Sequence, residues 1–138
     1  MVKGSSKKIR GFAKKAVVVG GGYIAIGFAS IFHGVGCEVT QLYRGDLFLR
    51  GFDQSIREPM ATTMKAKKLD VRFNTDVLSV ERSEDGMLHV ALSDGSTLET
   101  DLVLYATGRR PNLAGLGLEN TAVKLDDHGY VDVDQDYQ

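Results

Sequence analysis

The spacing of apolar and polar positions changes period several times along the chain, and each change predicts a new element. Residues 17–19 are three valines, apolar on both faces, as in a strand at the middle of a parallel sheet. After three glycines, apolar residues recur at helical spacing: Ile24, Phe28, Ile31 and Phe32. A second strand is expected over residues 37–43, which completes one βαβ unit of about 30 residues.

A second helix is expected from Asp53, an N-cap residue, to about Lys68. Its apolar residues lie four apart, at Ile56, Met60 and Met64. Pro59 falls inside this stretch, and proline removes an N–H and clashes with the preceding turn. The helix is therefore predicted to kink there or to begin later than Asp53.

From Asp70 the pattern alternates with a period of two, which is typical of strands. The expected strands cover residues 71–73, 77–82, 88–92 and 97–99, with turns at 84–86 and 93–95. The last three strands form an antiparallel meander, which leads to a final buried strand at 102–105. A further short strand is expected at 130–133 with no obvious partner, as in the first piece of another domain.

The glycines after the first strand fit the fingerprint G-x-G-x-x-G/A through Gly20, Gly22 and Ala25. The first glycine permits a tight turn, the second lets a pyrophosphate approach the backbone, and the alanine keeps helix close to strand. The phosphates would then sit at the helix N-terminus. The candidate cofactor-binding residues of this turn are Gly20, Gly21, Gly22, Tyr23, Ile24 and Ala25. The alternative is a βαβ unit without a ligand. The fold class predicted is α/β, a Rossmann-like βαβ dinucleotide-binding domain with a parallel sheet and an antiparallel three-stranded meander crossover.

The end of the second strand bears on the choice of nucleotide. An NAD site places Asp or Glu there, to bond the ribose 2′-OH, whereas this chain has Tyr43 followed by Arg44, with Arg50 nearby. Two guanidiniums suit the oxygens of a 2′-phosphate, so NADPH is favoured over NADH. The alternatives are that both arginines are solvated loop charges, or that Asp46 pairs with one of them.

Composition narrows the remaining classes of function. The 17 basic and 18 acidic residues among 138 give a net charge of −1, so no nucleic-acid or anionic-membrane partner is expected. The single cysteine, Cys37, excludes an internal disulfide and is expected to be a small buried residue. His89 is expected to be structural, and no residues have metal-ligand spacing. With no membrane span or signal peptide in the pattern, a cytoplasmic location is expected.

Four segments together resemble the pyridine-nucleotide-binding domain of the flavin-dependent disulfide reductases (class I pyridine nucleotide-disulfide oxidoreductases), in particular the glutathione reductase branch. They are VVVGGGYIAIGFASIFHGVG, YRGDLFLRGFD, ATGRRPN and GLGLE. In that family NADPH passes a hydride to FAD, and a cysteine pair then reduces a small-molecule disulfide. The resemblance implies that Arg44 and Arg50 clamp the 2′-phosphate and that Tyr23 covers the nicotinamide pocket. The residues that it implies return toward the flavin domain are Ala106, Thr107 and Gly108.

The chain also departs from the family pattern. Gly27 stands where the family usually has a glutamate that pairs with a flavin-domain lysine. The flavin fingerprint, the cysteine pair and the interface domain are absent, so no catalytic residue is assigned. The expected organisation is a basic linker or leader at 1–14, an NADPH-binding domain at 15–112 and a tail at 113–138 returning toward an absent FAD domain. Such a module would bind NADPH but reduce no disulfide alone, and its partner would be the remainder of the reductase. The alternatives are the same domain of a trypanothione, mercuric or lipoamide-type reductase, and a free-standing nucleotide-binding or sensor module.

Overall fold

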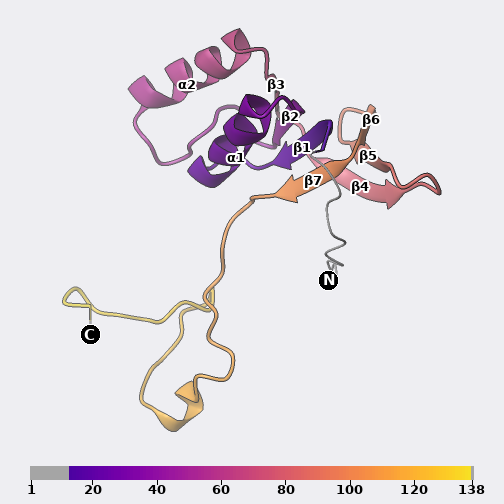
Figure 1. Ribbon diagram of the computed structural model, residues 1–138. Coiled ribbons are helices and arrows are strands. Elements are labelled where there is room, and N and C mark those ends of the chain that lie inside the picture. The colour runs from indigo at the N-terminus through magenta and orange to yellow at the C-terminus, as the bar shows by residue number, and fades with distance from the viewer. Residues whose placement is uncertain (1–12, 138) are drawn as a thin grey trace. The chain divides into compact units, whose positions relative to one another are not determined.

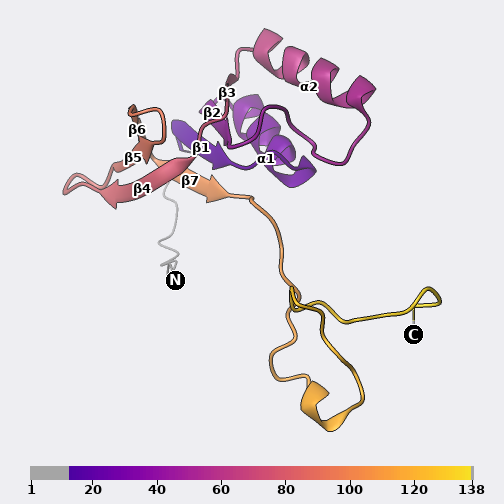
Figure 2. The same cartoon turned by 180° about the vertical axis from the view of Figure 1, so that it is seen from behind.

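The computed structural model describes residues 13–137, and these divide into two compact units between Thr107 and Gly108. The first unit holds both helices and all the strands, as Figure 1 shows from one side and Figure 2 from behind. Most of the expected basic segment at 1–14 lies outside the described residues. The expected domain bounds stay a prediction.

A four-stranded parallel sheet forms the centre of the first unit. Its strands are β1 (Lys15–Val19), β2 (Glu38–Tyr43), β3 (Asp70–Phe73) and β7 (Leu102–Tyr105). Their order is β3-β2-β1-β7, and every neighbouring pair is parallel. Helix α1 (Tyr23–Gly34) connects β1 to β2, and α2 (Gln54–Ala66) connects β2 to β3. The predicted βαβ unit is confirmed, and the carboxyl ends of all four strands share one edge of the sheet.

A three-stranded antiparallel sheet lies between β3 and β7 in the chain. It comprises β4 (Val77–Arg82), β5 (Leu88–Leu92) and β6 (Thr97–Thr100), paired in the order β4-β5-β6. This is the predicted meander, in place of a third crossover helix. The α/β fold class predicted from the sequence is therefore confirmed.

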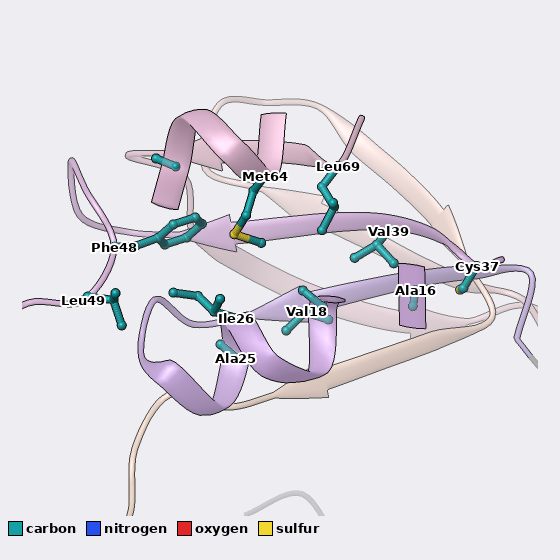
Figure 3. Packing of buried hydrophobic residues seen from close by; sticks show 12 residues of the cluster. Ala16, Val18, Ala25, Ile26, Cys37, Val39, Phe48, Leu49, Met64 and Leu69 are labelled. Atoms are coloured by element: carbon teal, nitrogen blue, oxygen red, sulfur yellow. The ribbon is translucent and has the colours of Figure 1, made fainter. Parts of the chain in front are cut away.

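The two faces of β1 serve two separate cores because side chains alternate along a strand. Ala16 and Val18 join the cluster shared with α1 and α2, whose side chains point toward one another in Figure 3. Val17 and Val19 pack instead in a cluster that includes Val90 of β5. The helices and the meander thus cover opposite faces of the parallel sheet, which buries its central strands on both sides.

Helix α1 turns small side chains toward the sheet. Ala25, Ile26 and Ala29 are buried, whereas Phe28 is 43% exposed and Ile31 58%. The apolar residues at helical spacing in the sequence are therefore not the buried face. Close packing explains the difference: a Cβ built on Gly20 would lie 3.2 Å from the Cβ of Ala25, a separation that leaves no room for a larger residue.

Helix α2 begins directly after Asp53, whose carboxylate accepts a 2.9 Å hydrogen bond from the backbone N–H of Ser55. The predicted N-cap is confirmed, and the predicted late start is wrong, since Pro59 lies inside the helix. The cap holds the turn before the proline, and burial of Ala61 and Met64 holds the turns after it.

Two predictions about the carboxyl-terminal part of the chain are wrong. Strand β7 is only half-buried to exposed, because it lies at the edge of the sheet. The strand expected at 130–133 does not form: Val131 makes one isolated antiparallel bridge, to Leu125. The second unit contains one short 3-10 helix, η1 (Leu118–Asn120), and none of its described residues is buried. Without a neighbouring strand or a core, nothing extends that bridge into a ladder.

Candidate nucleotide-binding site

The glycine turn joins β1 to α1 at the carboxyl edge of the parallel sheet. Gly20 has φ +139°, and a Cβ built there would lie 2.4 Å from the carbonyl oxygen of Ala106. A Cβ on Gly21 would lie 2.5 Å from a ring carbon of Tyr43. These two positions therefore exclude any side chain, whereas no atom lies within 4 Å of a Cβ on Gly22. The turn is packed tightly from behind and open at its third glycine.

The N-terminus of α1 presents unpaired backbone donors at this opening. Gly22 is the N-cap and makes no side-chain cap hydrogen bond, and the first turn holds no acidic residue. The helical ladder begins with the N–H of Ile26, which donates to the carbonyl of Gly22 at 3.1 Å. The N–H groups from Gly22 to Ala25 precede that ladder and carry the positive end of the helix dipole. Open space, free N–H groups and a positive dipole end fit a pyrophosphate.

Arg44 and Arg50 lie on the segment 44–53 between β2 and α2, and both are exposed. Within the described residues neither arginine takes part in an ion pair, and the pairing with Asp46 considered from the sequence does not occur. Tyr43, rather than an acidic residue, is the last residue of β2. The loop therefore offers two guanidiniums without internal counter-ions.

This loop is joined to the glycine turn by its backbone. The N–H of Leu49 donates to the carbonyl of Gly21 at 2.7 Å, one residue before Arg50. Phe48 is fully buried between the rings of Tyr43 and Phe73, at centroid distances of 6.1 and 4.8 Å. Figure 3 shows Phe48 and Leu49 entering the core from the loop. The buried pair fixes the loop beside the turn and leaves Arg50 outside the core.

The A-T-G segment meets the same turn from β7. The N–H of Ala106 donates to the carbonyl of Val19 at 2.8 Å, which brings the carbonyl of Ala106 against Gly20. Ala106 and Thr107 belong to the first unit, and Gly108, at φ +146°, is the first residue of the second. Tyr23, the first residue of α1, is 61% exposed, and Ile24 is half-buried. Three segments distant in sequence thus converge on the glycine turn.

Two residues that support the site were not singled out from the sequence. Gln41 is fully buried in β2, and its Nε2 donates to the carbonyl of Gly20 at 3.0 Å, while its Oε1 has no partner. Arg57, in the first turns of α2, donates from Nε to the carbonyl of Phe48 at 2.7 Å. A lone amide in an otherwise apolar strand was a signal for Gln41. For Arg57 no local signal exists, because its partners are chosen by how the loop folds.

The comparisons with known proteins agree with this geometry. Residues 2–138 match the model of the pyridine nucleotide-disulphide oxidoreductase family. The chain belongs to this family. Its members are enzymes, and the solved structures that resemble the chain include flavoprotein disulfide reductases.

Individual members of the family give the extent of the match. A glutathione reductase of Burkholderia cepacia is 47% identical over 121 residues, covering 88% of this chain and 27% of that protein. A trypanothione reductase of Trypanosoma congolense is 37% identical over 125 residues, covering 88% and 25%. The flavoprotein disulfide reductase RclA of Escherichia coli, in a Cu(II) complex, superposes with a TM-score of 0.81 at 31% identity, covering 92% and 28%. The chain thus spans about a quarter of the length of these family members.

Other reactive side chains do not compete with this site. Cys37 is buried, as predicted, and burial together with the carboxylates of Asp101 and Glu38 raises the pKa of its thiol. A raised pKa keeps a cysteine protonated and a poor nucleophile. His89 is half-buried, as predicted, and its Nδ1 lies 3.8 Å from a carboxylate oxygen of Glu99. In the part of the chain that the structure describes, no group of three or more His, Cys, Asp or Glu residues could hold a metal ion.

A polar hollow of about 420 Å³ lies elsewhere in the first unit, lined among others by Lys15, Glu38, His89 and Glu99. Lys15 and Glu38 begin β1 and β2, so the hollow lies at the amino edge of the sheet, opposite the glycine turn. None of the predicted nucleotide-binding residues lines it. Across the described residues no helix is both long and apolar enough to cross a membrane.

Proposed function

We propose that this chain is the NADPH-binding domain of a glutathione reductase-like flavoprotein. The observation that carries the proposal is the hydrogen bond from the N–H of Leu49 to the carbonyl of Gly21, which joins the arginine loop to the glycine turn. One site therefore offers N–H groups for a pyrophosphate and, next to them, guanidiniums for a further phosphate. NADPH carries both groups, and NADH lacks the second.

The direction of the bound nucleotide follows from the elements. The pyrophosphate lies against the N–H groups from Gly22 to Ala25, at the open side of the turn. The adenosine ribose lies toward the end of β2, where Arg44 and Arg50 bond the 2′-phosphate. A carboxylate at position 43 would repel that phosphate, and Tyr43 does not. The nicotinamide extends to the other side, past Tyr23 and the segment from Ala106 to Gly108.

The bound NADPH supplies a hydride, which in the whole flavoprotein reaches FAD. Residues of this chain bind and orient the nucleotide, and the flavin and the reaction with the disulfide belong to the remainder of the reductase. We infer a small-molecule disulfide as the final substrate, with glutathione disulfide favoured by the 47% identity to a glutathione reductase. The trypanothione reductase at 37% identity is the second candidate. The 138-residue chain alone is expected to bind NADPH without reducing either disulfide.

The test is calorimetric titration of the chain with NADPH and NADH at matched salt. Arg44→Ala and Arg50→Ala should each weaken NADPH binding about ten- to a hundredfold, the effect of losing a charge-assisted hydrogen bond of roughly 1.5–3 kcal/mol. NADH binding should not change, because NADH has no 2′-phosphate. Arg82→Ala is the matched control, since Arg82 lies in β4, in a different sheet. Equal affinities of the wild-type chain for the two nucleotides, or no binding of either, would overturn the proposal.

A further inference from the structure

Arg57 connects the first turns of α2 to the loop that carries Arg44 and Arg50. Its Nε donates to the carbonyl of Phe48 at 2.7 Å, and its Nη2 donates to the carbonyl of Leu47 at 3.0 Å. A third hydrogen bond, 3.2 Å long, runs from Nη1 to Oε1 of Gln54. The planar guanidinium thus binds two successive carbonyls of the loop at once. Arg57 is itself half-buried, so these bonds compete little with water.

The loop needs such a restraint because of its backbone conformation. Leu49 has φ +57°, in the left-handed region that residues with a Cβ seldom occupy. Its side chain is only 5% exposed, and its N–H bonds the carbonyl of Gly21 at 2.7 Å. The carbonyls of Leu47 and Phe48, held by Arg57, immediately precede this residue. Arg57 therefore fixes the direction in which the chain enters the contact with the glycine turn.

The consequence reaches the exposed arginines on either side. Arg44 precedes the buried stretch of the loop and Arg50 follows it, so their spacing depends on how residues 47–49 are folded. Binding of one phosphate by two guanidiniums requires both to be placed before the ligand arrives, or binding loses the cost of ordering them. A loop without the carbonyl contacts keeps the same charges but not their arrangement.

We propose that Arg57 is a positioning residue for nucleotide choice: it touches no ligand, and it sets the preference for the 2′-phosphate by holding the loop of Arg44 and Arg50. This inference rests on the proposed function, since it concerns the same nucleotide site. It assigns to Arg57 a geometric role, distinct from the attraction that any positive charge near the site would exert.

The experiment compares the ratio of NADPH to NADH affinity in the wild-type chain, Arg57→Lys and Arg57→Met. Lysine keeps the charge but cannot donate to two carbonyls in a planar fork. Both variants should therefore lower the ratio about three- to tenfold, through NADPH alone, as expected when a site loses one or two hydrogen bonds. In both variants the N–H of Leu49 should also exchange faster with deuterium, a readout that needs no nucleotide.

Arg82 provides a matched control, because its Nη1 donates to the carbonyl of Gly86 in a hairpin of the meander. Arg82→Lys and Arg82→Met should leave the ratio unchanged. If Arg57→Met does not fold, Arg57→Lys decides. A ratio kept by Arg57→Lys overturns the inference, since charge would then account for the effect. An unchanged ratio in the Arg57 variants, with the preference lost in Arg44→Ala, overturns this inference alone. A wild-type chain without any preference overturns the proposed function as well.

Discussion

Gly27 and Gly20 show how differently two glycines of one motif region are constrained. Gly27 is an exposed residue in the interior of α1, and no atom lies within 4 Å of a Cβ built there. Gly20 has φ +139° and a carbonyl oxygen 2.4 Å from its Cβ position. The first glycine is therefore dispensable for the fold of this chain, and the second is required by it.

We predict that Gly27→Ala raises the free energy of unfolding by about 0.5–1 kcal/mol, because alanine restricts the unfolded chain and favours the helix. Gly27→Glu, which restores the residue usual in the family, should also fold without a clash. The measurement is urea denaturation followed by circular dichroism. The matched control is Gly20→Ala, which should lose about 1–3 kcal/mol through backbone strain. Equal effects of the two alanines would show that the local geometry does not govern either position.

At the scale of elements, the meander is held to the parallel sheet by a small cluster of its own. Leu92 of β5 is 1% exposed and packs in the cluster that includes Val17, Val19 and Leu42. We predict that Leu92→Ala lowers the free energy of unfolding by about 2–5 kcal/mol, the usual cost of a cavity in a core. Leu78→Ala, on β4 at 70% exposure, is the control and should change it by less than about 0.5 kcal/mol. Thermal or chemical denaturation of both variants measures the difference. A small loss for Leu92→Ala would mean that the meander contributes little to the core.

Elements with a clear local pattern were predictable, and those fixed by long-range contacts were not. The alternation between glycine turns gave β4 and β5 with their observed bounds. The buried face of α1 could not be found this way, because close approach to the strand selects small residues and leaves larger ones outside. The exposure of β7 depends on its place at the sheet edge, which one segment cannot reveal.

The site divides along the same line. Spacing alone located the glycine turn and the arginine loop, because both lie at the ends of strands with strong apolar patterns. Their connection through Leu49 and Gly21 joins residues 28 positions apart, and no local pattern encodes it. Arg57 has an unremarkable place in an amphipathic helix, so only its hydrogen bonds to Leu47 and Phe48 distinguish it from a solvated arginine.

At the scale of the whole molecule, the two units differ in the means by which they are held together. The first has two hydrophobic clusters, one on each side of the parallel sheet. In the second, no described residue is buried, and its regular structure is limited to η1 and the bridge between Leu125 and Val131. Segments with few buried contacts open locally at little cost in free energy, so the second unit should admit a protease before the first unfolds.

We therefore predict that trypsin cuts the chain early after Arg109 and Lys124, which are exposed in the second unit. Arg72 and Arg82 lie in β3 and β4 and are the internal controls, since cleavage there requires a strand to leave its sheet. Mass spectrometry over a time course, with and without NADPH, gives the order of cleavage. Early cuts in the second unit, with nucleotide binding retained by the larger product, would support a domain whose tail packs on the remainder of a reductase. Cleavage at Arg72 as fast as at Arg109 would contradict the difference between the units. Resistance of Arg109 and Lys124 would instead favour a free-standing nucleotide-binding module with a packed tail.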